Sequence, residues 1–172
     1  DLEKRVQDRT ESLQLARDEL TQKINDLKML GAVVDKSYFA ISIVDLQSPG
    51  IPQIYVNPAF TKVTGFTAEQ SIGNQCRIFH DGIADPDAMN QINLALENNS
   101  ACTVEFIDQR QNGEKFWNRL SIFPVIIEDA LPRHYVIFQH DISALKQASA
   151  ERETLLQEIQ ENQRLQSLGV LV

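Results

Sequence analysis

The six prolines of this 172-residue chain are confined to its middle, between Pro49 and Pro132. A proline inside a helix removes a backbone hydrogen bond and clashes with the preceding turn, so proline-free stretches are where long helices can form. The first 48 and the last 40 residues contain no proline and only two glycines. We therefore predict three parts: an N-terminal helix over residues 1–36, a compact domain over 37–142 and a C-terminal helix over 143–172.

The N-terminal stretch carries an aliphatic residue at every seventh position, which is the heptad spacing of a coiled coil. A helix with such a seam needs a partner, so we expect a homodimer through coiled-coil helices. The alternative is a single amphipathic helix that folds back on the middle domain. In the C-terminal stretch the heptad phase slips after Ile159, which predicts a less regular coil. The N-terminal line consists of Val6, Leu13, Leu20, Leu27 and Val34.

The middle of the chain reads as two strands, several short helices and three further strands. Proline, asparagine and glycine signals predict short helices from Pro58 to a stop at Gly65, and at about 67–72, 75–79 and 85–97. This order predicts an α+β domain with one five-stranded antiparallel sheet, one face of which is covered by the helices. Turns are expected at 112–113 and near Asp129. Period-two alternation places the strands at Tyr38–Asp45, Gln53–Val56, Thr103–Arg110, Phe116–Ile127 and Arg133–Ile142.

Composition and charge exclude several classes of protein. The chain has 16 Lys+Arg against 24 Asp+Glu and a net charge of -8, which argues against a nucleic-acid partner because phosphate binding needs clustered Lys and Arg. No apolar run approaches the roughly 20 residues of a membrane span, so we expect no direct membrane contact. Two cysteines and no metal-ligand spacing predict a reducing, cytoplasmic compartment and no metal site.

Several motifs in the middle of the chain resemble those of one known superfamily. They are YVNPAF at 55–60, VTGF at 63–66, the turn at 112–113 followed by FWN at 116–118, and DIS at 141–143. Together they resemble a PAS domain, over about residues 37–146. Within that superfamily, GNQCRIFH at 73–80 is similar to the flavin-binding signature of the light-oxygen-voltage (LOV) photoreceptors.

The resemblance implies that flavin mononucleotide (FMN) is bound non-covalently between the helices and the sheet. Cys76 corresponds to the cysteine that adds to ring carbon C4a under blue light, in an adduct that decays in the dark. Arg77 corresponds to the phosphate-binding arginine, and a planar guanidinium suits a phosphate. The remaining counterparts bind the ring: Asn118 and Gln139 at its polar edge, with Gln139 also sensing the protonation of N5, and Leu120 and Ile122 along its face.

Four positions depart from the LOV pattern. Gln75 and Asp108 stand where the family has asparagine, and His80 stands where it has glutamine; Gln75 and His80 keep donors for the ribityl chain and the ring edge. Asp108 can accept from the flavin N3–H but cannot donate to a carbonyl oxygen, and burying it unpaired is costly. Ile137 replaces a frequent glycine and crowds the pocket. The expected consequences are weaker flavin binding, a different flavin such as FAD or none, or lost photochemistry.

The two ends of the chain resemble parts of bacterial sensor histidine kinases. Residues 5–11 resemble the linker before a PAS domain, and residues 163–171 resemble the start of a kinase dimerisation helix. The resemblance implies a blue-light sensory module, not itself an enzyme, that regulates a kinase domain in the same longer chain and then a response regulator. Reaction at Cys76 would change hydrogen bonding at Gln139 and shift the flanking helices.

Two alternatives remain open at the level of the sequence. One is a PAS module that binds a small ligand or senses redox state without photochemistry, in which Cys76 is a buried core cysteine only. The other is an empty dimerisation spacer between two coils. Cys102 is expected to be inert under each of these hypotheses.

Overall fold

The computed structural model describes residues 1–80, 85–127 and 131–169. The chain divides into two compact units, Asp1–Tyr38 and Phe39–Val172. The turn predicted near Asp129 and the last two residues of the kinase-like segment at 163–171 lie outside the described residues. Within the described ranges, no helix combines the length and the apolar character needed to cross a membrane.

The first unit contains one helix, α1 (Leu2–Asp35), which agrees with the helix predicted from the absence of proline. The side chain of Asp1 caps its first turn by accepting from the Glu3 N–H. Lys23 and Glu19 form an ion pair one turn apart, at 3.1 Å. No residue of α1 is buried, and four of the five heptad-seam residues are exposed in the single chain: Val6, Leu13, Leu20 and Leu27. Pairing of this seam with a second helix stays a prediction.

The second unit is built on the predicted five-stranded antiparallel sheet, with strand order β2-β1-β5-β4-β3. The observed strand ends lie within one residue of expectation except at two positions, which differ by two residues. The first strand starts at Ala40 rather than Tyr38, because the Asn57 side chain donates to the Phe39 carbonyl at 2.9 Å. The fourth ends at Val125, the last residue that the fifth strand pairs. The strands are β1 (Ala40–Asp45), β2 (Gln53–Val56), β3 (Cys102–Gln109), β4 (Lys115–Val125) and β5 (His134–Asp141).

Four short helices follow β2 in the chain, as the turn and cap signals predicted. Thr67 and Gln70 form a reciprocal capping box at the second of them. The third starts at Arg77 instead of residue 75, because Gln75 is held in an isolated bridge to Pro52. The helices are α2 (Pro58–Thr64), α3 (Ala68–Ser71), α4 (Arg77–His80) and α5 (Pro86–Glu97).

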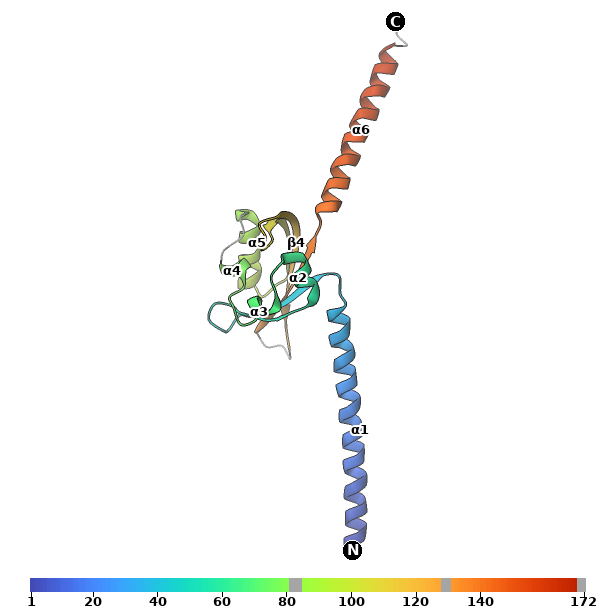
Figure 1. Ribbon diagram of the computed structural model, residues 1–172, viewed down its shortest axis with the longest axis vertical. Coiled ribbons are helices and arrows are strands. Elements are labelled where there is room, and N and C mark those ends of the chain that lie inside the picture. Colours follow the sequence, from blue (N-terminus) through green and yellow to red (C-terminus); the bar gives the residue numbers. More distant parts are fainter. Residues whose placement is uncertain (81–84, 128–130, 170–172) are drawn as a thin grey trace. The chain divides into compact units, whose positions relative to one another are not determined.

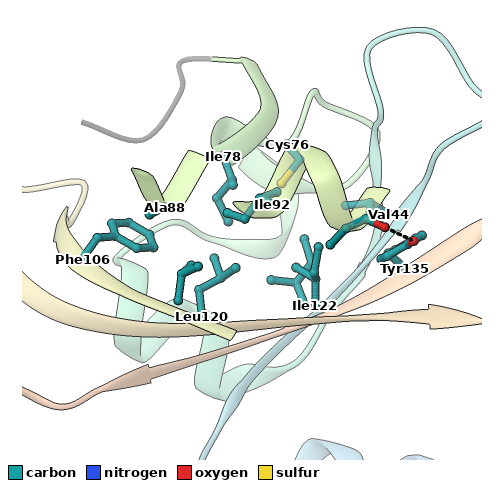
Figure 2. Close-up of a cluster of buried hydrophobic side chains, with 12 residues drawn as sticks. Val44, Cys76, Ile78, Ala88, Ile92, Phe106, Leu120, Ile122 and Tyr135 are labelled. Atoms are coloured by element: carbon teal, nitrogen blue, oxygen red, sulfur yellow. Dashed lines mark hydrogen bonds between the residues drawn. The ribbon is translucent and has the colours of Figure 1, made fainter. Parts of the chain in front are cut away.

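The helices cover one face of the sheet and form the hydrophobic core with it (Figure 1). Figure 2 shows the larger cluster, in which Cys76 and Ile92 from the helical layer meet Leu120 and Ile122 from the sheet. The buried Tyr135 hydroxyl donates to the backbone of α5 at 3.4 Å and ties β5 to that helix. A smaller cluster lies under α2. The α+β fold class is therefore confirmed.

The last helix, α6 (Ser143–Gly169), starts directly at the end of β5. The Asp141 side chain accepts from the Ser143 N–H at 2.9 Å, and the Trp117 N–H donates to the Ser143 hydroxyl at 2.9 Å. Lys146 lies over the Trp117 ring, 4.7 Å from its centroid, and pairs with Glu105 at 2.6 Å. The first turn of α6 is thus bonded to three strands of the sheet.

Candidate functional site

A cavity of about 120 Å³ lies among the short helices and the inner face of the sheet. Its wall is contributed by α2, α3, α4, β2, β3 and β5, so it is enclosed by elements distant in sequence. Several of the residues expected at a ligand site border it, and two of these carry opposite charges. The lining residues are Gln53, Phe60, Thr64, Phe66, Gln70, Ser71, Gln75, Cys76, Arg77, Ile78, Asp108 and Gln139.

Cys76 both borders this cavity and packs in the core, with 1% of its surface exposed. Its backbone position is set by a bond from its N–H to the Ile51 carbonyl, at 3.2 Å. Burial raises the pKa of the Cys76 thiol to about 11, outweighing the backbone hydrogen bonds and the nearby Arg77 charge that lower it. At neutral pH this sulfur therefore carries its proton. Cys102 is half-buried on β3 and does not border the cavity.

Arg77 and Asp108 form an ion pair at the cavity wall, between the start of α4 and the end of β3. The Arg77 Nη2 lies 3.0 Å from Asp108 Oδ1 and also donates to the Gln109 carbonyl at 3.2 Å. The guanidinium lies over the Phe66 ring, 5.0 Å from its centroid. Asp108 was expected to be costly if buried without a partner, and the structure shows that it has one.

Asn118 lies next to Asp108 on the neighbouring strand and is completely buried. Its Nδ2 donates to Asp108 Oδ2 at 3.0 Å, so its amide orientation is determined by a group that can only accept. The Asn118 Oδ1 has no hydrogen-bond partner among the described residues. A buried acceptor without a donor is rare in a native protein. A bound molecule with a hydrogen-bond donor would satisfy it.

Gln139 is 3% exposed and borders the cavity from the middle of the sheet, where it pairs with Ala40 on β1 and Leu120 on β4. Gln75 also borders the cavity and is accommodated by Gly50, whose φ is +80°. A Cβ at Gly50 would lie 2.5 Å from the Gln75 side-chain nitrogen. Glycine is therefore favoured at this position by the backbone angle, and a larger residue would also displace the Gln75 side chain.

Four of the expected residues are buried and do not border the cavity, among them Asn118. Leu120, Ile122 and Ile137 are fully buried in the larger hydrophobic cluster, on the inner face of the sheet. A role for Leu120 and Ile122 against a ring face stays a prediction. His80 is the last residue of α4, and its side chain lies outside the described part of the chain.

Several residues that line the cavity were not predicted from the sequence to belong to the site. Phe60 and Thr64 share one face of α2 through their four-residue spacing, and both are buried. Gln70 on α3 and Gln53 on β2 add amide groups to the wall. Helical spacing of Phe60 and Thr64 was a usable signal for an inward face, whereas nothing local to Gln70 indicated a pocket.

The residues at the cavity fit a flavin in their chemistry. A cation for a phosphate, amides for the ring edge and a neutral thiol line the cavity together. Asn118, whose Oδ1 needs a donor, does not line the cavity itself but is hydrogen-bonded to the lining residue Asp108. The cavity is smaller than the engineered cavity of about 150 Å³ that holds benzene. A three-ring ligand therefore requires some lining side chains to move outward, and the half-exposed Arg77 is the most accessible of the charged ones.

Comparison with known proteins identifies relatives with a sensory role. A PAS domain family model matches residues 39–144. The blue-light-activated histidine kinase of Brucella anthropi is 34% identical over 128 residues, covering 72% of this chain and 26% of that kinase. The chain thus spans about a quarter of the length of the curated relatives it matches.

Solved structures of similar fold include LOV proteins. The LOV domain of the Erythrobacter litoralis EL346 blue-light-activated histidine kinase has a TM-score of 0.56 at 33% identity, covering 61% of this chain and 96% of that one. An RNA-binding light-oxygen-voltage receptor has a TM-score of 0.66 at 28% identity, covering 78% and 38%. With the five-stranded sheet, the cavity beside Cys76 and the matched family model, the chain belongs to the PAS domain family and is of the LOV type.

Proposed function

We propose that this chain is a blue-light sensory module that binds FMN in the cavity and responds through Cys76. One observation carries the proposal: a buried thiol that keeps its proton borders a cavity whose wall also holds Gln139 and Arg77. LOV-type neighbours and blue-light-activated kinases among its relatives support a flavin as the ligand. Arg77 would bind the phosphate, and Gln75, Asn118 and Gln139 would bind polar atoms of the flavin.

The chain's own groups can perform two steps of such a response. A bound flavin, on absorbing blue light, would supply an electrophilic ring carbon, C4a, and a basic ring nitrogen, N5. Because burial keeps the thiol neutral, Cys76 can provide both the sulfur that would bond to C4a and the proton that would go to N5. The Gln139 amide can either donate or accept, so it can reorient when a neighbouring nitrogen gains a proton.

The response would leave the site through β5. Gln139 lies two residues before Asp141, whose side chain caps the first residue of α6. A change in the position of β5 can therefore reach α6 without passing through a loop. We infer a homodimer in which residues 1–36 and 143–172 form the coiled coils that flank the core at 37–142. These helices would regulate a histidine kinase domain, and through it a response regulator, in the cytoplasm.

An absorption spectrum of the purified chain, before and after blue light, tests this function. We expect a yellow protein whose visible band bleaches on illumination and recovers in the dark. Cys76→Ala should keep the yellow colour and lose the bleaching, and Cys102→Ala, which changes a cysteine away from the cavity, should behave as the unmodified chain. Bleaching that survives Cys76→Ala would contradict the role of this thiol.

A second candidate function follows from the size of the cavity. At about 120 Å³ it accommodates a ligand smaller than a flavin without any side-chain movement. In that case the chain would be a ligand-binding PAS module in which Cys76 serves the core. A purified protein that is colourless, and that is still colourless after incubation with FMN and removal of the free FMN, would favour this alternative over the first.

A further inference from the structure

The cavity wall carries two opposite charges in direct contact. Among the described lining residues, Arg77 is the single cation and Asp108 the single anion. An anionic group on a ligand is therefore attracted to Arg77 and repelled by Asp108. Because Arg77 Nη2 and Asp108 Oδ1 are 3.0 Å apart, an anion bound to this side of the guanidinium also meets the carboxylate.

The hydrogen bonds around Asp108 show which side of the pair is free to change. Asp108 Oδ1 accepts from Arg77 and from the Gln109 N–H, and Oδ2 accepts from Asn118. If Arg77 leaves, two donors still hold the carboxylate, so it is not left buried and unsatisfied. The Arg77 side chain is 42% exposed against 13% for Asp108. The arginine is thus the partner that can turn away.

Such an exchange has an energetic cost that depends on the ligand. A phosphate that binds Arg77 Nη2 replaces the charge-assisted bond to Asp108, and one that binds the other guanidinium nitrogens still lies near the carboxylate. A flavin without a phosphate has no group that competes with Asp108 for Arg77. The Arg77 side of the bond is half-exposed, which makes the bond weak enough to be exchanged.

We propose that Asp108 determines how strongly this pocket prefers a phosphorylated flavin, by competing with the phosphate for Arg77. Where the LOV pattern has a neutral asparagine, the carboxylate of this chain acts as an internal anion that reduces the advantage of FMN over riboflavin. This inference rests on the proposed flavin-binding function. It adds a specificity-determining role to a residue that otherwise stands out only as a departure from the pattern.

A competition between two flavins tests the role of Asp108. The purified 172-residue protein is equilibrated by dialysis with equal concentrations of FMN and riboflavin, and the bound flavins are separated and quantified. Contacts to the ring are common to both ligands, so the bound ratio isolates the phosphate. In Asp108→Asn we expect the FMN-to-riboflavin ratio to rise on the order of tenfold, equivalent to about 1.4 kcal/mol.

Glu105→Gln is the matched control, because it removes the same charge from the same strand. Glu105 lies on the opposite face of β3 and pairs with Arg119 and Lys146, away from the cavity. The ratio should stay within twofold of the unmodified value. An equal rise in Glu105→Gln would mean that only the overall charge matters, and the proposal would be wrong.

The same substitution in an Arg77→Ala variant distinguishes competition for Arg77 from simple repulsion between Asp108 and the phosphate. In Arg77→Ala, changing Asp108 to asparagine should leave the ratio unchanged, because the contested partner is absent. The same rise in both backgrounds, or no rise in either, overturns the inference while leaving flavin binding intact. If the unmodified protein binds neither flavin, the proposed function itself fails, and the inference fails with it.

Discussion

Two of the arginine–aspartate pairs in the second unit have opposite surroundings. Arg77 pairs with Asp108 at the cavity, and Arg110 pairs with Asp141 where β5 meets α6. Both guanidinium groups also lie over a phenylalanine ring, at 5.0 Å for Arg77 and 4.2 Å for Arg110. Their chemistry is therefore nearly the same, and what differs is how many fixed groups depend on each.

Arg110 is held from several directions. Its guanidinium donates to the Val63 carbonyl of α2 and to the Asp141 carboxylate, and its side chain is 16% exposed. Asp141 in turn caps α6. Removing Arg110 would leave the Val63 carbonyl without this donor and the Asp141 carboxylate with the Ser143 bond on one oxygen, whereas removing Arg77 leaves Asp108 with a donor on each oxygen. The Arg110–Asp141 pair is thus part of the framework of the fold, whereas Arg77 can leave Asp108 to bind a ligand.

The largest expected difference between the pairs is in stability. Arg110→Ala should lower the free energy of unfolding by about 2–3 kcal/mol, because a partly buried carboxylate loses its partner. Arg77→Ala should lower it by less than about 1 kcal/mol, because the Arg77 side chain is half-exposed and Asp108 keeps two other donors. Urea unfolding followed by circular dichroism gives both values. Similar losses in the two variants would contradict the assignment of Arg110 to the framework.

The stability that the Arg110–Asp141 pair contributes is expected to fall in acid. Burial alone would raise the pKa of Asp141, but hydrogen bonds from Ser143 and pairing with Arg110 outweigh it and lower the pKa. Its stabilising effect is therefore fully present above the unfolded value of about 3.9 and is lost as pH falls through the lower folded value.

Asp141→Asn keeps an acceptor for the Ser143 N–H and removes this titration. At pH 7 we expect the variant to be about 1 kcal/mol less stable than the unmodified chain. The gap should close as pH falls from about 4 to the lowest pH at which both proteins remain folded. Urea unfolding at successive pH values measures the gap. If it widens in acid, the carboxylate of Asp141 does not stabilise the fold through its ionised form.

The smallest effect is expected at a third ionic contact, on the outer face of the sheet. Glu105 joins Arg119 and Lys146, and all three side chains are at least 30% exposed. Glu105→Gln should cost less than about 0.5 kcal/mol. Hydrogen exchange should nevertheless become a few-fold faster for amides in the first turn of α6, near Lys146. Unchanged exchange there would show that the Ser143 and Asp141 bonds alone hold the helix start.

Local signals were sufficient for most of the fold. The confinement of proline placed the long helices, and the Asn57 and Asp85 caps placed the starts of α2 and α5. Alternating hydrophobicity located all five strands, and every predicted strand end lies within two residues of the observed end. These signals act within a few residues of the element that they specify, which is why they can be read without a structure.

The candidate site could be predicted only in part. The motif around Cys76 indicated the cysteine and the arginine, but the Arg77–Asp108 pair joins residues 31 positions apart. It depends on how the end of β3 meets the start of α4, which no local pattern encodes. The same holds for Asn118, whose orphaned oxygen follows from its register next to Phe106 and from the orientation that Asp108 imposes.

Because most of the seam of α1 is exposed in the single chain, the stability of this helix is expected to depend on protein concentration. A helix that buries none of its residues has little tertiary packing to stabilise it in the single chain. If a second copy covers the line from Val6 to Val34, pairing follows mass action, so α1 should lose helicity on dilution while the core keeps its structure. A sensor assembled in this way would report light only above the concentration at which its helices meet.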